Sequence, residues 1–226
     1  MDKAKAYLSL KKFSLDSGAD VFGVCDIGHL KEELILSNKI KEKLKFAISL
    51  GVCLSSAVLE DIEDAPTRLY FHHYRSVNMF LDQLSLRVAR HIQKKGFRAL
   101  SIPASQIVDW QKQSAHLSHK KIAALAGIGW IGRNNLLVNK KYGSQMRLIT
   151  ILTDMPLKAD KPSGESCGKC FSCLKICPAQ AIKEKKEDFD HMKCFEKLKQ
   201  FQKQRLVDQY ICGVCVKSCA GEKEAK

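Results

Sequence analysis

The sequence predicts an α/β fold in which a layered domain is followed by a small domain built around cysteines. Three observations carry this prediction. Segments with apolar residues at helical spacing alternate with short apolar runs up to about residue 154, as is typical of layered α/β domains. A turn-rich segment, residues 155–166, comes next. Eight of the ten cysteines follow it, so we expect domains at residues 1–157 and 158–226.

The first domain contains a regular succession of expected elements. Residues 3–17 have helix-forming composition, and residues 21–25 and 46–54 are expected to be short buried strands. The clearest helix covers residues 74–95, where apolar residues recur at three- and four-residue steps and Gly96 stands where a helix would stop. The later elements are strands at 97–102, 135–138 and 146–153 and a short helix at 117–125.

Composition limits the class of protein. Of the 226 residues 45% are apolar, and no apolar run reaches the roughly 20 residues needed to span a bilayer. The N-terminal residues lack a signal-peptide pattern, so we expect a cytoplasmic protein. The formal charge of +14 favours an acidic partner such as a tRNA, a nucleotide or an acidic redox protein. Solvated lysines on exposed helix faces account for the same charge equally well.

Residues 167–178 hold the most informative pattern in the chain. The spacing Cys-x2-Cys-x2-Cys-x3-Cys-Pro binds a 4Fe–4S cluster, and its fourth cysteine ligates the other cluster in two-cluster ferredoxins. A second run of cysteines follows, spaced by a helix expected within residues 187–209. The sequence therefore predicts two 4Fe–4S clusters with crossed ligation. The expected ligands are Cys167, Cys170, Cys173 and Cys219 for the first cluster and Cys177, Cys194, Cys212 and Cys215 for the second.

Disulfide bonds and structural zinc fit these cysteines less well. Disulfides need an oxidising compartment, and the N-terminus carries no segment that would direct the chain to one. Structural zinc uses separate pairs of cysteines, whereas three successive cysteines at this spacing precede a Cys-Pro pair here. Cys25 and Cys53 lie in apolar strands and are expected to be inert core thiols.

Residues 127–134 form the second unusual segment. Gly127, Gly129 and Gly132 lie close together around Trp130. Such glycines let backbone approach a ligand, but they also suit a tight helix-to-strand connection in which Trp130 fills the core. The spacing differs from the dinucleotide fingerprint, and the segment follows a helix rather than a strand. From the residues alone, both interpretations stay open.

Taken together, residues 126–137, the Gly143-Ser144 pair, residues 152–157 and the cysteine runs resemble the epoxyqueuosine reductases and, more distantly, the reductive dehalogenases. The resemblance covers roughly residues 45–219. It implies a nitroreductase-like, cobalamin-binding layered domain followed by a bacterial-ferredoxin-like two-cluster domain. Electrons from an external ferredoxin or flavodoxin would pass through the clusters to a corrinoid that reduces the substrate.

The resemblance also implies residue roles, with one departure. The aspartate of the family's Asp-Ser/Thr-Ala/Gly-Pro motif, its proposed proton donor, falls on Gln113 here, and an amide cannot deliver a proton as a carboxylic acid does. The helical extension that helps many epoxyqueuosine reductases hold tRNA is not part of this sequence, so we expect a short paralogue whose substrate is a tRNA or a small molecule. Corrinoid contacts are implied for Gly127, Gly129, Trp130, Gly132, Arg133, Asn134, Gly143 and Ser144.

His116, His119 and Tyr74 are candidate catalytic residues. Imidazole titrates near neutrality, so either histidine could replace the missing acid, and one of them could ligate cobalt. Surface or capping roles fit these histidines equally well, and Ser118 is a suitable N-cap. Tyr74 lies in the aromatic and histidine-rich segment 70–75, which could line a substrate pocket or anchor the start of the long helix.

Two function hypotheses follow. The first is a cobalamin-dependent reductase that receives electrons through two clusters. The second is an electron-transfer protein that binds no corrinoid and donates to a partner enzyme. Gln113 favours the second hypothesis, whereas the complete glycine–tryptophan segment favours the first. A tRNA-binding module rests only on charge and family analogy.

Overall fold

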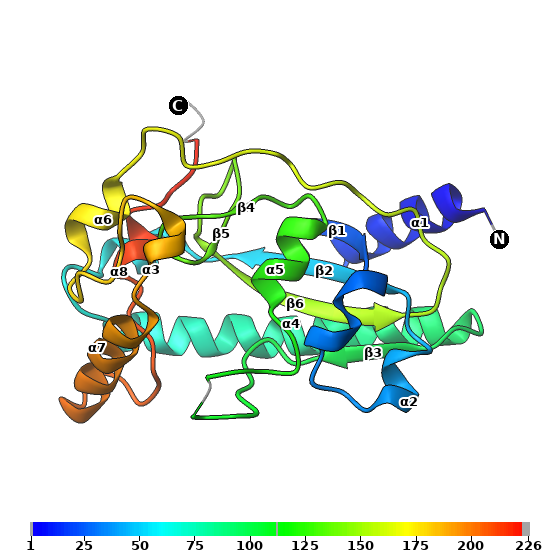
Figure 1. Ribbon diagram of the computed structural model, residues 1–226, viewed down its shortest axis with the longest axis horizontal. Helices are drawn as coiled ribbons and strands as arrows, with labels where there is room; N and C mark the ends of the chain where they lie inside the picture. Colours follow the sequence, from blue (N-terminus) through cyan, green and yellow to red (C-terminus); the bar gives the residue numbers. More distant parts are fainter. Residues whose placement is uncertain (1, 112, 223–226) are drawn as a thin grey trace. The chain divides into compact units, whose positions relative to one another are not determined.

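The computed structural model describes residues 2–111 and 113–222 (Figure 1). The chain divides into two compact units. Each unit is assembled from three separate stretches of chain. The first, called unit 1, comprises Met1–Val52, Asn78–Ile128 and Arg147–Ser163. The second, called unit 2, comprises Cys53–Val77, Gly129–Met146 and Gly164–Lys226.

The two units differ from the expected division into residues 1–157 and 158–226. The last boundary, between Ser163 and Gly164, does lie inside the turn-rich segment. However, Cys53–Val77 and Gly129–Met146 belong with the cysteine-rich part of the chain. Pairing between stretches so distant in sequence leaves no local signal, which is why composition alone predicted a single boundary.

A four-stranded sheet forms the centre of unit 1. Its strands lie in the order β1 (Val21–Asp26), β2 (Phe46–Cys53), β6 (Met146–Thr153) and β3 (Ala99–Ile102). The β1 strand runs antiparallel to β2, and β3 runs antiparallel to β6. Most residues of β1, β2 and β6 are buried, which indicates that both faces of the sheet are covered.

Alternate residues of the strands face opposite layers. Cys25 packs in a core cluster with residues of η1 (Gly28–Glu33) and α5 (His119–Leu125). Phe22 is three positions before Cys25 in β1, so its side chain lies on the opposite face of the sheet. Its ring meets the Tyr7 ring of α1 (Lys3–Asp16) edge-on at 5.4 Å. The Ser101 hydroxyl of β3 is 2.5 Å from the Ser85 hydroxyl of α4 (Arg68–Lys94). The sheet therefore lies between a layer of α5 and η1 and a layer of α1 and α4.

Polar side chains fix where the helices begin. Asp2 accepts a hydrogen bond from Ala4 N at 2.9 Å and caps α1. Ser118 caps α5 as expected, by accepting from Lys121 N at 3.4 Å. The α4 helix begins at Arg68 rather than at residue 74, because Thr67 accepts from the amide of the third residue beyond it.

Unit 2 consists of short elements around its cysteines. A hairpin of β4 (Trp130–Ile131) and β5 (Leu137–Val138) follows α5 in the chain. The α8 helix (Val214–Lys217) packs against α6 (Ser172–Ile176) and α3 (Ser56–Glu60). Lys217 Nζ donates to the carbonyl oxygens of Glu60 at 3.0 Å and Ile62 at 2.5 Å, which holds α8 to the segment after α3. The remaining helices are η2 (Lys186–Asp188) and α7 (His191–Lys203), and α2 (Asn38–Lys41) belongs to unit 1.

Most expected elements are present, and the mixed α/β class is confirmed. The strand β4 was not expected, and the strand expected at 135–138 is limited to Leu137–Val138. The helix expected within 187–209 begins at His191, where Asp190 caps it. No helix in residues 2–111 and 113–222 is long and apolar enough to cross a bilayer.

The segment 155–166 is anchored in its first half rather than being a loose linker. Asp160 exchanges hydrogen bonds with Val24: its N–H donates to the Val24 carbonyl at 2.8 Å, and its carboxylate accepts from Val24 N at 2.9 Å. A Cβ on Gly127 would come within 2.6 Å of the Lys161 carbonyl oxygen. Gly127 is therefore needed where this segment passes the end of α5.

Candidate functional site

The eight motif cysteines all belong to unit 2, and their thiols influence one another in two groups. Burial, followed by negative charge on Cys219, Cys167 and Cys170, raises the pKa of Cys173 to about 11. The pKa of Cys219 is raised by burial, and Cys167 and Cys170 add to this. Cys219 is distant in sequence from the other three, yet it is their electrostatic neighbour. These four are called the first cysteine group.

The second cysteine group consists of Cys177, Cys194, Cys212 and Cys215. Burial raises the pKa of Cys212 to about 12, and charge on Cys194 and Cys177 contributes. Burial, followed by charge on Cys212, Cys194 and Cys177, raises the pKa of Cys215 well above its usual value. Cys177 is four positions from Cys173 but interacts with the other group. Charge on Cys173 also raises the pKa of Cys215. The α6 helix, which carries Cys173, packs against α8, which carries Cys215, so the two groups are adjacent.

The sulfur positions can be tested against the kind of metal centre that they fit. All ten cysteines lie in the described residues, and none of them forms a disulfide. Within the same residues, no three His, Cys, Asp or Glu side chains could hold a single metal ion. In a 4Fe–4S cluster each thiolate binds a different iron, so its four sulfurs need not converge on one point. Each group supplies four cysteine thiols, which is the kind and the number of ligands that a 4Fe–4S cluster takes.

Arg133 organises the loop that carries the first cysteines. Its guanidinium donates hydrogen bonds to the carbonyl oxygens of Cys170 at 3.0 Å and Gly168 at 2.9 Å. The Nε–H donates to the Glu184 carbonyl at 2.5 Å, and the guanidinium stacks on the Phe171 ring at 4.3 Å. With its donors engaged in this way, Arg133 contacts its own chain where the resemblance implied contact with a corrinoid.

Trp130 and Ser144 contact thiols of the same group, and Asn134 holds Ser144 in place. The Trp130 indole Nε1 donates a hydrogen bond to Cys167 Sγ at 3.3 Å. Ser144 hydrogen-bonds the Cys219 thiol through its side chain and its backbone, and both bonds lower the pKa of that thiol against the effect of burial. Asn134 Nδ2 donates to the Ser144 hydroxyl at 3.1 Å and fixes its position. Sequence reasoning missed this support of the cysteines, since nothing in the spacing joins residues 130–144 to residue 219.

The glycines of the same segment contact this chain rather than an open cavity. A Cβ on Gly129 would overlap the Val138 carbonyl oxygen, and one on Gly132 would lie 2.5 Å from the Val138 side chain. A Cβ on Gly143 would overlap the Cys219 carbonyl oxygen. The clearance expected for a corrinoid is thus used by the chain itself at these positions, and the glycines alone offer no cradle for a corrinoid. A substitution such as Gly129→Val would therefore disturb the β4–β5 hairpin directly, whether or not a corrinoid binds there.

His119 is held in one protonation state by two hydrogen bonds. Its Nε2 lies 2.9 Å from the Pro103 carbonyl oxygen, which can only accept, so Nε2 carries the proton. Its Nδ1 lies 2.8 Å from the Thr150 hydroxyl and accepts from it. Burial lowers the pKa of His119 to about 4, against a smaller raising effect of the Pro103 bond. In this arrangement the neutral ring ties the start of α5 to β6.

This pKa predicts that the protein loses stability in acid. A histidine that binds fewer protons when folded stabilises the fold above its unfolded pKa of 6.5, and this contribution is lost as the pH falls toward 4. We expect the free energy of unfolding to fall by about 1 kcal/mol between about pH 7 and about pH 5.5 because of this residue. Urea unfolding under anaerobic conditions measures it. His119→Gln keeps a donor and an acceptor but cannot titrate, so an equal loss in this variant would contradict the assignment.

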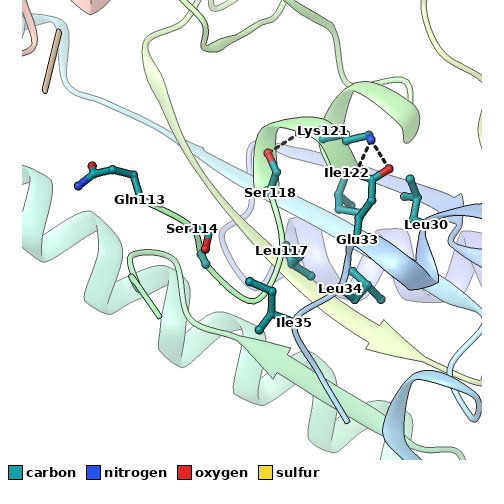
Figure 2. A pocket seen from close by; sticks show the side chains of 11 residues that line it. Leu30, Glu33, Leu34, Ile35, Gln113, Ser114, Leu117, Ser118, Lys121 and Ile122 are labelled. Atoms are coloured by element: carbon teal, nitrogen blue, oxygen red, sulfur yellow. Dashed lines mark hydrogen bonds and ion pairs between the residues drawn. The ribbon is translucent and has the colours of Figure 1, made fainter. Parts of the chain in front are cut away.

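A cavity of about 360 Å³ lies in unit 1, and the two chain neighbours of His116, Ala115 and Leu117, are among the residues that line it. The Nδ1 of His116 is 2.7 Å from the Ile35 carbonyl oxygen, and Ile35 N donates to the His116 carbonyl at 2.9 Å. Figure 2 shows the apolar side chains gathered in this cavity, the Lys121–Glu33 ion pair at 2.5 Å beside them, and Gln113 apart from them. The lining residues are Leu30, Glu33, Leu34, Ile35, Gln113, Ser114, Ala115, Leu117, Ser118, Lys121 and Ile122.

Gln113 is itself unusual in conformation. Its φ of 53° lies in the left-handed region, which residues other than glycine rarely adopt. Its side-chain Nε2 donates to the Trp110 carbonyl at 3.1 Å. The position that corresponds to the family's aspartate therefore carries an amide bound to its own loop.

Tyr74 and Lys120 complete the candidate residues. Tyr74 belongs to unit 2, where it is buried with its ring 6.2 Å from that of Tyr70, whereas His116 and His119 belong to unit 1. Lys120 was not among the expected site residues, because a lysine after an N-cap is usually solvated. Burial lowers the pKa of Lys120 to about 8, so its ammonium group can give up a proton near neutral pH.

Comparison with known proteins bears on this site. No family model matches the chain. An epoxyqueuosine reductase from Yersinia pestis is 45% identical over 69 residues, which are 30% of this chain and 17% of the relative. One from Pseudomonas aeruginosa is 39% identical over 111 residues, which are 49% of this chain and 28% of the relative. The chain is similar to the epoxyqueuosine reductases. The resemblance expected from the sequence is confirmed, although the matched segments form less than a third of each of these relatives.

Solved structures share the fold over almost the whole chain. A catabolic reductive dehalogenase in complex with 3-bromo-4-hydroxybenzoic acid has a TM-score of 0.77 at 20% identity and covers 96% of this chain and 32% of its own. The epoxyqueuosine reductase from Streptococcus thermophilus has a TM-score of 0.63 at 20% identity, with 96% of this chain and 68% of its own covered. At these identities the likeness establishes the fold.

Proposed function

We propose that this epoxyqueuosine reductase-like chain is a redox protein that carries electrons through two 4Fe–4S clusters to a reductase reaction. The observation that carries the proposal is the division of eight thiols into two adjacent groups of four. This division supports crossed ligation, with Cys177 contributed to the second cluster and Cys219 to the first. We infer further that unit 1 is a nitroreductase-like layer and that the cysteine-rich segment is a ferredoxin-like domain.

Each cluster would supply a site for one electron, and the chain determines how the clusters are held. Burial raises the pKa of most of these thiols, so iron binding must release their protons as the thiolates form. Arg133 fixes the loop of the first cysteine group through its carbonyl contacts. Thiolates of this kind require a reducing compartment such as the cytoplasm, and a low-potential ferredoxin or flavodoxin is the class of donor that suits them.

Metal analysis tests the proposal. Protein reconstituted anaerobically with iron and sulfide should hold about eight irons and eight sulfides per chain, since each cluster contains about four of each. The reduced protein should give the electron paramagnetic resonance signals of two clusters. Stoichiometric zinc, or fewer than about five irons after full reconstitution, would refute the two-cluster assignment.

A corrinoid as the acceptor of these electrons is a second candidate. It is favoured by the segment shared with the epoxyqueuosine reductases and by the fold shared with a reductive dehalogenase described as B12-dependent, with a TM-score of 0.78 at 20% identity. The packed glycines of residues 129–143 give it no support. Hydroxocobalamin titrated into the cluster-loaded chain should bind below about millimolar concentration if the candidate is right. Absence of binding in both redox states favours the electron-transfer protein without a corrinoid.

The substrate is proposed in outline only. An epoxyqueuosine reductase with a TM-score of 0.60 and 21% identity has been solved with a tRNA stem loop, and it covers 95% of this chain and 64% of its own. The charge of +14 suits such a partner. Gln113 cannot act as the family's acid, so a tRNA substrate requires a different proton donor here, for which Lys120 has a suitable pKa of about 8.

A further inference from the structure

The second cysteine group borders a surface groove of unit 2. Cys177 and Cys194 are both partly exposed, the first at the end of α6 and the second in the first turn of α7. A groove of about 620 Å³ is lined by residues 178–180, which directly follow Cys177, and by residues of α7 that precede and follow Cys194. It is called the α7 groove. A molecule seated in it would lie close to two ligands of the proposed second cluster.

Backbone hydrogen bonds fix the segments that line this groove. Gln180 N donates to the Cys177 carbonyl at 3.0 Å and closes a turn in which Gln180 has a left-handed φ of 51°. Asp190 N donates to the Ala181 carbonyl at 2.9 Å, and the Asp190 carboxylate caps α7 by accepting from Lys193 N at 2.9 Å. The α7 groove is therefore a preformed surface, which a partner can bind without first ordering it.

Apolar side chains are exposed next to both cysteines. Ile176 directly precedes Cys177 and is 41% exposed, and Met192 is two positions before Cys194 and 55% exposed. Met192 also lines the groove, together with Pro178. A flexible thioether adapts to irregular partner surfaces. Exposed apolar side chains gathered beside proposed cluster ligands indicate a surface that another molecule covers.

The α7 helix adds positive charge to this surface. Its 13 residues include four lysines and a single glutamate. Lys193 and Lys197 line the groove, and the Lys193 side chain is 59% exposed with the Asp190 carboxylate 3.9 Å away. Glu196 also lines the groove, but it pairs with Lys199 at 2.8 Å. The helix as a whole therefore attracts a negatively charged partner.

The first cysteine group has no comparable approach in the described part of the chain. The cavity beside Cys167 holds about 180 Å³, and its charged lining residues are Glu165, Glu184, Arg133 and Lys186. The two charges of each sign balance, and the Arg133 guanidinium donates to carbonyl oxygens of its own chain. The larger and more positive surface is therefore the one beside the second group.

We propose, on the basis of the two-cluster function proposed above, that the α7 groove is the docking site of an acidic one-electron carrier protein and the place where electrons enter the chain. Electrons pass between two proteins only where their redox centres come close, and this groove adjoins Cys177 and Cys194. The lysines attract the carrier, and the apolar centre holds it. The carrier is oxidised by one electron as one cluster is reduced by one electron.

Stopped-flow mixing of a reduced, acidic flavodoxin with the reconstituted full chain tests this site. Reduction of the wild type should be fast at low ionic strength and should slow about tenfold as the salt rises to about 0.5 M, because salt screens opposite charges. Lys193→Gln combined with Lys197→Gln removes two charges and should slow reduction about fivefold at low salt. The matched control, Lys3→Gln combined with Lys5→Gln in α1, removes two exposed lysines of unit 1 and should leave the rate unchanged.

A matched pair of methionines tests the apolar centre. Met192→Ala should raise the flavodoxin concentration that gives half the maximal rate about fivefold, because the complex then buries less apolar surface. Met79→Ala shortens a methionine of unit 1 that is 59% exposed, and it should have no effect. This pair decides the question by itself if the lysine variant fails to take up its clusters.

Three results would count against these proposals in different ways. Equal behaviour of the variants and their controls in both pairs would overturn the docking site. If the α7 lysine variant loses tRNA binding but is reduced at the wild-type rate, the lysines serve a nucleic acid, and the docking site is overturned as well. A wild type that holds no cluster reducible even by dithionite would instead defeat the proposed function.

Discussion

Replacing Cys177 with serine should remove the second cluster and leave the first intact. Cys177 completes the continuous run of residues 167–178, and by sequence proximity it would belong with Cys173. Its thiol instead interacts with those of Cys194, Cys212 and Cys215. Because a cluster with a missing thiolate ligand is destabilised, we expect the iron content of the variant to fall from about eight to about four per chain.

The matched control is Cys173→Ser, the same substitution four positions earlier. Cys173 interacts with Cys219, Cys167 and Cys170, so this variant should keep the second cluster and lose the first. Iron and sulfide analysis gives the number of clusters, and the magnetic resonance spectrum identifies the one that remains. If Cys177→Ser and Cys173→Ser retain the same cluster, the crossed assignment is wrong.

Local patterns were sufficient to predict most helices and strands. The α1 helix and the strands β1, β2 and β6 occur where apolar spacing placed them, because each of these elements buries a face or both faces in the sheet of unit 1. Capping chemistry also acts locally, which is why Ser118 was recognised from its position. The start of α4 was misplaced because its first turns belong to unit 2 and bury the aromatic residues Tyr70, Phe71 and Tyr74, whereas the remainder carries a mostly aliphatic stripe.

The sequence predicted the candidate site only at its cysteines. Their spacing is typical of cluster ligands, because the loop between two ligands must fit one cluster. The residues that support those cysteines carry no such constraint in sequence. A glycine at position 129 indicates that something lies too close to its Cα for a side chain, but the spacing does not state whether this is a ligand or the chain itself. In the structure it is the Val138 carbonyl oxygen, so substitutions of this glycine report on the packing of the chain.

Gly143→Ala should therefore be among the most damaging single changes in unit 2. Gly143 has a φ of 57°, and its added Cβ would overlap the carbonyl oxygen of Cys219. The left-handed backbone costs an alanine about 1–2 kcal/mol, and overpacking against a fixed backbone adds about 1–3 kcal/mol. The overlap also displaces Cys219, the proposed fourth ligand of the first cluster. We expect both a lower free energy of unfolding and loss of the first cluster.

Gly164→Ala separates the two causes. Gly164 also has a left-handed φ, of 70°, but nothing lies within 4 Å of its added Cβ. This variant should lose only the backbone contribution of about 1–2 kcal/mol and keep both clusters. Denaturant unfolding of the two variants, with iron analysis of each, measures the difference. Because the backbone strain is shared, any excess loss in Gly143→Ala reports the contact with Cys219, and equal losses with full cluster content would show that this contact does not hold the ligand in place.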